Sequence, residues 1–261
     1  MQVTRRDAGI KFGPQEWFLA IWRTPSVTVA RLLLDSYFRS VWLWIEVVLV
    51  LAFFAALFFP FLEYRSYFYG TSNFDMAGIA ILGAVMMVRH STSARVYVLL
   101  SRLSSRAAYS RGLMLATALL RIPLFSLLLV LVLIARRLID PVAGSMAIGV
   151  LGLLPNIILV SVLTVTLSSP MARRLDRIFF LAWLAAALFS LSPIVRLPAS
   201  LINVLSIVRI PILPLSACFQ VSTSGSVGWS DVWAFVVVGM YIVGLVWLAG
   251  YWLERRELLL H

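Results

Sequence analysis

The chain has 261 residues, of which 62% are hydrophobic and 13% are charged, and its mean hydropathy is +0.98. A soluble domain carries about 25% charged residues, so this composition excludes an ordinary water-soluble domain and predicts a single membrane domain. The formal net charge is +11. The chain has one cysteine, Cys218, which excludes an intrachain disulfide and a multi-cysteine metal site.

Residues 1–40 are predicted to form a cytosolic N-terminus and an interfacial helix. Ser26 is predicted to cap this helix, in which Arg31, Asp35 and Arg39 are spaced by four and give a charged stripe with two possible ion pairs. The pattern predicts an amphipathic elbow helix that transmits motion or, with equal weight, a plain membrane anchor. Apolar side chains cover much of the rest of the helix: Leu32, Leu33, Leu34, Tyr37 and Phe38.

Residues 41–261 are predicted to form a six-span transmembrane domain, because their apolar runs approach the roughly 20 residues that cross about 30 Å of hydrocarbon. The stretch of about 196–230 is apolar but interrupted by prolines, which predicts short, broken outer helices that re-enter the membrane between the fifth and sixth spans. The expected fold class is therefore an all-α membrane protein. The predicted spans are about 41–62, 72–89, 112–135, 142–168, 178–195 and 231–252.

Lysine and arginine are distributed unevenly between the two sides of these spans. With both termini cytosolic, the cytosolic parts hold 16 positive residues and the opposite side holds five, while Arg121 falls inside the third span. Cytosolic loops are enriched in such residues. The bias predicts a multi-pass protein of the cell (inner or plasma) membrane with both termini cytosolic, and it accounts for the basic charge without a nucleic acid partner.

Glu46 in the first span and Arg121 in the third are ionisable residues in apolar runs. Such groups cost roughly 2.5–3.5 kcal/mol on insertion scales and usually face protein or water. They could line a substrate path together with Asn156, they could pair, or they could reach the lipid headgroups, which is the favoured interpretation.

The fourth span carries small residues and the pair Pro155–Asn156, where the helix can bend. The favoured explanation of the small residues is that they allow close helix packing. They are Gly144, Gly149 and Gly152.

Catalytic motifs are missing from the sequence. The single lysine, Lys11, does not stand in a glycine-rich phosphate-binding loop, and the chain has neither the ligand spacing of a zinc hydrolase nor a G-x-S-x-G turn with a histidine base. We therefore expect that the chain is not an enzyme and that it holds no cofactor or metal of its own.

The basic loop of about 89–111 contains a predicted amphipathic helix whose arginines, Arg95 and Arg102, lie off its apolar face. A short helix held between two spans is a natural docking element for a soluble partner, although such helices about as often only lie on lipid. The apolar residues are Val96, Leu99, Leu100 and Leu103.

Residues 99–112 read L-L-S-R-L-S-S-R-A-A-Y-S-R-G. This string resembles the stretch L-L-S-R-P-x-S-R-x-x-Y-x-x-G-K that follows the second span in permeases of the type-2 ABC transporter family. The predicted layout is similar over nearly the whole chain: an elbow helix, six spans, a coupling helix after the second span, and broken outer helices before the sixth.

The resemblance implies a membrane-spanning permease subunit of an ATP-driven ABC exporter. In that family the coupling helix sits in a groove of a separate ATPase subunit, which binds ATP and Mg²⁺, and a second permease subunit, identical or similar, completes the substrate path. The resemblance places the following residues at the ATPase: Arg95, Tyr97, Leu99, Leu100, Arg102, Ser105 and Arg106.

Two other functions remain open at this stage. A non-transporting membrane scaffold or sensor would also recruit partners through its loops. An enzyme that acts on lipid is less favoured, because it needs clustered acids or histidines near the headgroups, whereas the cytosolic carboxylates here are scattered along the chain. In each case membrane lipids are expected partners.

Overall fold

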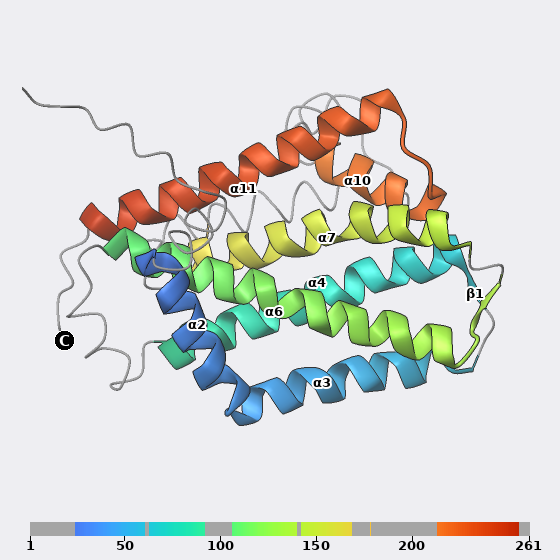
Figure 1. Cartoon of the computed structure of the whole chain (residues 1–261), viewed down its shortest axis with the longest axis horizontal. Coiled ribbons are helices and arrows are strands. Elements are labelled where there is room, and N and C mark those ends of the chain that lie inside the picture. Colours follow the sequence, from blue (N-terminus) through green and yellow to red (C-terminus); the bar gives the residue numbers. More distant parts are fainter. Residues whose placement is uncertain are drawn as a thin grey trace, which may run out of the picture.

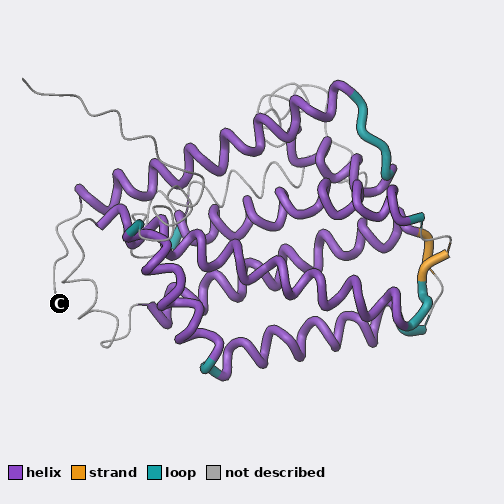
Figure 2. The backbone as a smooth tube through the Cα atoms, viewed as in Figure 1, coloured by secondary structure: helices purple, strands orange, loops and turns teal. Residues whose placement is uncertain are grey.

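The computed structural model describes residues 24–60, 63–91, 106–139, 142–168, 178 and 213–255. In these ranges the chain is almost entirely helical, and the helices run lengthwise in one bundle (Figures 1 and 2). The prediction of an all-helical fold is confirmed at this level. The helices are α2 (Pro25–Phe38), α3 (Val41–Phe53), the π-helical η1 (Phe54–Phe58), α4 (Arg65–Ser91), α6 (Arg106–Ile134), α7 (Ala143–Thr166), α10 (Leu213–Ser224) and α11 (Trp229–Arg255).

Among the described residues, five helices are long and apolar enough to cross a membrane. They match the first four predicted spans and the sixth, so the chain has the composition of a multi-pass membrane protein. The fifth predicted span, 178–195, lies outside the described residues except for residue 178, as does the 196–212 part of the predicted outer helices. The five helices are Val41–Phe58, Arg65–Ser91, Arg106–Ile134, Ala143–Thr166 and Asp231–Glu254.

Two helices begin before the apolar runs of their predicted spans. α4 begins at Arg65, seven residues before its run, and α6 begins at Arg106, six residues before its run. The apolar runs mark only the segments suited to hydrocarbon, whereas the backbone hydrogen bonds of a helix do not depend on apolar side chains. Both helices therefore continue through the polar residues that flank their apolar runs.

α4, α6 and α7 form the centre of the bundle, with α3 along one side, α11 along the other and α2 across one end (Figure 1). Between 39% and 50% of the apolar windows of the three central helices is buried, against 17% for α3 and for α11. α2 packs on α6 through its buried face, which consists of Val29, Ala30, Leu33 and Tyr37.

The start of α2 differs from the prediction. Thr24 occupies the cap position and Pro25 the first helical position, so Ser26 lies inside the helix and the prediction that it caps α2 is wrong. Proline suits the first helical position because the amide hydrogen that it lacks would have no partner there. Of the two predicted ion pairs, the one that forms among the described side chains joins Arg39 to Asp35 at 3.2 Å, and both are exposed.

Glycines of α7 allow close packing, as the sequence predicts. A Cβ atom on Gly149 would overlap the ring of Tyr69, a residue of α4. The Tyr69 hydroxyl donates to the carbonyl oxygen of Met146 at 2.8 Å. A Cβ atom on Gly152 would lie 2.8 Å or less from backbone atoms of α10. Gly144 has open space beside it, so the packing explanation does not extend to that residue.

The two ends of the bundle are built differently. At the strand end, the linkers before α4 and before α7 pair as two short parallel strands, β1 (Glu63–Tyr64) and β2 (Leu138–Ile139), which were not predicted (Figure 2). The opposite end, where α4 ends at Ser91 and α6 begins at Arg106, is called the loop end below.

Candidate functional site

A buried ion pair joins α3 to α6. The two side-chain nitrogens at the tip of Arg121 face the carboxylate of Glu46, with Nη1 3.0 Å from Oε2 and Nη2 donating to Oε1 at 3.1 Å. Both residues are 1% exposed. A buried pair of this kind persists only when the remaining polar atoms also find partners, because both charges have lost their hydration.

Neighbouring groups supply partners for most of these atoms, while Glu46 Oε2 has its ion-pair contact with Arg121 but no hydrogen bond within the described residues. The guanidinium of Arg121 also donates to the carbonyl oxygens of Ile79 on α4, at 3.1 Å, and of Thr117 on its own helix, at 3.4 Å. Tyr37 on α2 donates its hydroxyl to Glu46 Oε1 at 2.6 Å. Burial and this hydrogen bond raise the pKa of Tyr37 above its usual range, so the phenol stays protonated and remains a donor.

Gly83 on α4 makes room for the pair. A Cβ atom at this position would overlap both the carboxylate of Glu46 and the guanidinium of Arg121. We call these four residues, Tyr37, Glu46, Gly83 and Arg121, the buried pin. The pin joins α2, α3, α4 and α6 at one place through charge-assisted hydrogen bonds, which are stronger than neutral ones.

The buried pin decides between the predictions made for its charges. The pairing of Glu46 with Arg121 is confirmed, and the prediction that they reach the headgroups is wrong. Arg121 lies 15 residues after Arg106, about four turns into α6, and the surrounding helices enclose both side chains. The pathway role stays a prediction.

Side chains at the loop end tie the two sides of the 92–105 segment together. Ser36 on α2 is hydrogen-bonded to Nε2 of His90 on α4 at 2.6 Å, and the Tyr109 hydroxyl of α6 donates to Ser91 Oγ at 2.6 Å. α2 also rests on Gly112 of α6, where a Cβ atom would lie 2.7 Å from α2 atoms. The end of α4, the start of α6 and α2 therefore form one packed unit.

The residues predicted to face an ATPase fall almost entirely on the 92–105 segment. Arg106 is the exception, since it is the first residue of α6 and is exposed. The others lie outside the described residues, and their role stays a prediction. They are Arg95, Tyr97, Leu99, Leu100, Arg102 and Ser105.

Asn156 does not join the buried pin. Its side chain is 4% exposed, and its Nδ2 donates to the carbonyl oxygen of Leu215 on α10 at 3.2 Å. Its Oδ1 is buried and has no hydrogen-bond partner among the residues that the structure describes. The residue therefore joins α7 to α10, and the three residues predicted for a substrate path are not gathered at one point.

Sequence reasoning missed three residues. The sequence pattern assigns Tyr37 only to the apolar face of the N-terminal helix. Nothing in the sequence distinguishes Gly83 from glycines that merely allow packing. Asp75 did carry a signal, because it is an ionisable residue inside the predicted span 72–89. Its Oδ2 atom is buried and, within the described ranges, has no hydrogen-bond partner.

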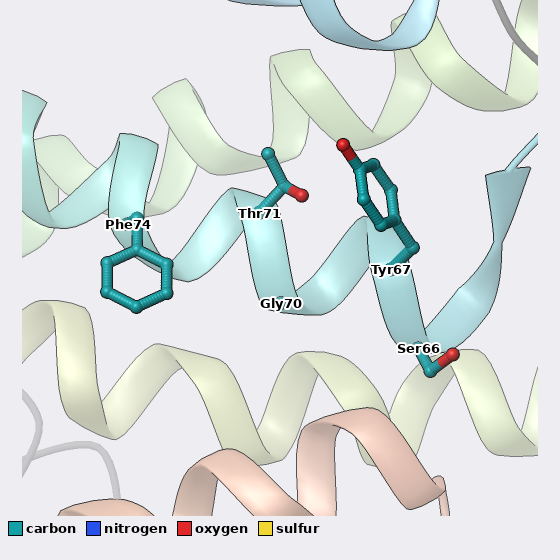
Figure 3. Close-up of a pocket in the computed structure, with 5 residues that line it drawn as sticks. All are labelled: Ser66, Tyr67, Gly70, Thr71 and Phe74. Carbon is teal, nitrogen blue, oxygen red and sulfur yellow. The ribbon is translucent and has the colours of Figure 1, made fainter. Parts of the chain in front are cut away.

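An open groove of about 500 Å³ lies on α4 one turn from Asp75, toward the strand end (Figure 3). All of its lining residues come from that helix: Ser66, Tyr67, Gly70, Thr71 and Phe74. The groove thus combines hydroxyl groups with two aromatic rings.

In the part of the chain that the structure describes, no group of three or more His, Cys, Asp or Glu residues is close enough to hold a metal ion. No protein-family model, curated protein or solved structure matches this chain.

Proposed function

We propose that this chain is the membrane-spanning permease subunit of an ATP-driven ABC exporter, driven by a separate ATPase subunit that docks on the 92–105 segment. The observation that carries the proposal is the string of residues 99–112, together with its place between the second and third long apolar helices of the chain. In this proposal the ATPase supplies ATP binding and hydrolysis, and the chain supplies the substrate path.

The packing of the loop end supports this function. The 92–105 segment joins α4 to α6, and these two helices contact each other. Hydrogen bonds from Ser36 and Tyr109 fix the end of α4 to α2 and to the start of α6. A partner that pushes on 92–105 would therefore move α2, α4 and α6 together.

The buried pin, which lies further inside the bundle, also supports a joint movement of these helices. Removing one partner of a buried ion pair costs about 3–5 kcal/mol, which indicates that separating the two charges of the pin is strongly unfavourable. The loop ends of the four pinned helices would thus respond to a docked partner as one rigid body, as in a hinge or shear motion.

The finer features belong to the same proposal. α2 acts as the elbow helix, 92–105 contains the coupling helix, and 178–195 forms a further span. Both termini then lie in the cytosol, and a second copy or a similar chain completes the path through the inner or plasma membrane. The packing of α2 against α6 supports its role in transmitting motion.

Affinity purification of the tagged full chain from its native membranes tests the proposal. We expect an ATPase with a phosphate-binding loop to copurify with the wild-type chain. The double variant Leu99→Asp/Leu100→Asp should reduce the amount of copurified ATPase at least tenfold, because two charges disrupt an apolar docking face. A matched control, Val142→Asp/Val227→Asp, places the same charges on exposed valines toward the strand end and should retain the ATPase.

Equal recovery of the ATPase with both double variants would overturn the proposed docking site. A scaffold would also bind a partner, so the purified complex must show ATP hydrolysis that rises when a transported compound is added. An ATPase rate that no candidate substrate changes would favour the scaffold.

A further inference from the structure

The outer half of α4, toward the strand end, is polar for a membrane-spanning helix. The best apolar window of the whole helix has a mean hydropathy of 1.4, whereas the other four candidate spans reach 2.3 to 2.5. The polar residues are concentrated in the consecutive run Gly70-Thr71-Ser72-Asn73-Phe74-Asp75. Polar and ionisable groups at this depth are costly against lipid, so they indicate a face that meets protein, water or a ligand.

Asp75 lacks a counter-charge in the described structure. Five carboxylates have described side chains, and four of these have partners: Asp35, Glu46, Asp231 and Glu254. No hydrogen bond or ion pair is formed by the fifth, Asp75, within the same residues, and its Oδ2 is buried while the residue as a whole is only partly so. Asp75 lies ten residues after Arg65, about 15 Å along the helix.

The nearby cations in the described ranges are engaged elsewhere. The guanidinium of Arg121 is held by Glu46, that of Arg65 donates to the carbonyl oxygen of Ser224, and that of Arg137 lies 4.9 Å from the centre of the Phe59 ring. A buried carboxylate without a partner strongly attracts a positive charge.

The groove of Figure 3 lies beside this carboxylate along α4, although Asp75 is not one of its lining residues. Thr71 lines the groove and precedes Asp75 by four residues, so the two side chains are neighbours on one face of α4. Phe74 and Tyr67, 74% and 49% exposed, give the groove two aromatic surfaces. Ser72, one turn before Asp75, is fully buried, and its hydroxyl has no hydrogen-bond partner in the part of the chain that the structure describes.

We infer that this groove is a substrate site for amphipathic cations, with Asp75 as the anion that receives the positive group. The aromatic rings of Tyr67 and Phe74 accept the apolar body of the ligand and add cation–π attraction. The inference rests on the proposed transport function for its biological meaning, but the binding site itself does not require an ATPase.

Binding of tetraphenylphosphonium to the purified chain in detergent tests the inference, with tetraphenylborate as a ligand of nearly the same shape and opposite charge. We expect the wild-type chain to bind the cation, and Asp75→Asn to weaken that binding about tenfold, because the removed charge lies in a site of low dielectric constant. Binding of tetraphenylborate should stay equal or become tighter.

Two further variants make the result specific. Asp75→Glu keeps the charge and should restore most of the affinity, while Asp231→Asn removes a carboxylate at the start of α11 and should leave binding unchanged. Wild-type protein that does not bind the cation, or an Asp75→Asn variant that binds it as tightly, would overturn the site. Circular dichroism of each variant shows that the chain is folded.

The two proposals fail separately. An ATPase that copurifies with a chain unable to bind tetraphenylphosphonium would leave the transport function standing and overturn the substrate site. Charge-dependent binding by a chain that recruits no ATPase would overturn the transport function and leave the site in place.

Discussion

The loop end and the strand end of the bundle are held together by different kinds of interaction. At the loop end and in the bundle interior next to it, particular side chains carry the contacts: the Ser36–His90 hydrogen bond and the Tyr109–Ser91 hydrogen bond at the end itself, and the buried pin deeper in. At the strand end, backbone geometry contributes as well: the pairing of β1 with β2 and the turn that ends α6 stand beside side-chain contacts such as that of Arg65 with Ser224.

This difference indicates at which end the structure depends on the identity of individual residues. A buried charge has few acceptable partners, so the loop end should tolerate very few substitutions. Backbone hydrogen bonds can form whichever side chain a residue carries. The strand end should therefore tolerate more substitutions than the loop end. The motion of a docked partner would also be transmitted best through the end that is held by specific side-chain contacts. This is the end that carries the 92–105 segment.

The largest expected effect comes from breaking the ion pair. Arg121→Met leaves the buried carboxylate of Glu46 without its partner, and we expect the free energy of unfolding to fall by about 3–5 kcal/mol. Arg39→Met makes the same chemical change in the exposed pair with Asp35 and should cost at most about 0.5 kcal/mol. Denaturant titration in mixed micelles, followed by circular dichroism, measures both changes.

The double variant Glu46→Met/Arg121→Met checks the cause of that loss. It removes both charges, so it should be more stable than Arg121→Met alone, since replacing both partners of a buried pair by apolar groups is often nearly neutral. A double variant that is less stable than the single one would show that packing, not charge, dominates at the pin.

Gly83→Ala should have the next largest effect. The added methyl group overlaps Glu46 and Arg121 and forces them apart, so we expect a loss of about 3 kcal/mol. Gly78→Ala is the matched control, because it lies on the same helix with open space around its Cβ position, and it should stabilise the chain slightly. Equal midpoints of thermal unfolding for the two variants would contradict the proposed crowding at Gly83.

Tyr37→Phe should have a smaller effect, confined to the attachment of α2. The substitution keeps the ring and removes one hydrogen bond to a charged oxygen, at a cost of about 1.5 kcal/mol. Hydrogen exchange of the α2 amides should become faster, while that of α7 should not. Tyr64→Phe, at a residue that is 67% exposed, should change neither the free energy of unfolding nor the exchange of the α2 amides. Faster exchange throughout the bundle in Tyr37→Phe would count against a local role for Tyr37.

The helices of this fold were predictable from the sequence, because their apolar runs are long and separated by charged loops. The presence of the first four spans and the sixth followed directly from this pattern. The start of α4 did not, since this helix continues through polar residues that a hydropathy pattern assigns to a loop. The β1–β2 pairing involves only two residues in each strand, and so short a segment leaves no periodic signal.

The candidate site was predictable only in part. The sequence identified Glu46 and Arg121 as costly residues, and pairing was among the alternatives, but the favoured interpretation was that both reach the lipid headgroups. Tyr37 and Gly83 depend on how α2 and α4 approach the pair, which a sequence pattern does not record. Asp75 was accessible to the same reasoning as Glu46 and was passed over.

The smallest expected effect concerns the strand end, at the turn that ends α6. Arg136 adopts a left-handed backbone conformation, with φ of 52°. Its amide donates to the carbonyl oxygen of Leu133 and the next amide donates to that of Val132, which is the Schellman arrangement usually built on glycine. We expect Arg136→Gly to raise the free energy of unfolding by about 0.5 kcal/mol, since the relief of strain exceeds the added chain entropy of glycine.

Two substitutions at the same position separate backbone strain from charge. Arg136→Lys keeps both the charge and the left-handed conformation, so its stability should equal that of the wild type. Arg136→Ala removes the charge and keeps the strain, so it should gain nothing. If alanine stabilises the chain as much as glycine, the gain comes from lost charge repulsion, and the strand end depends on an individual side chain in the same way as the loop end. Stabilisation by glycine alone shows that backbone geometry controls this end.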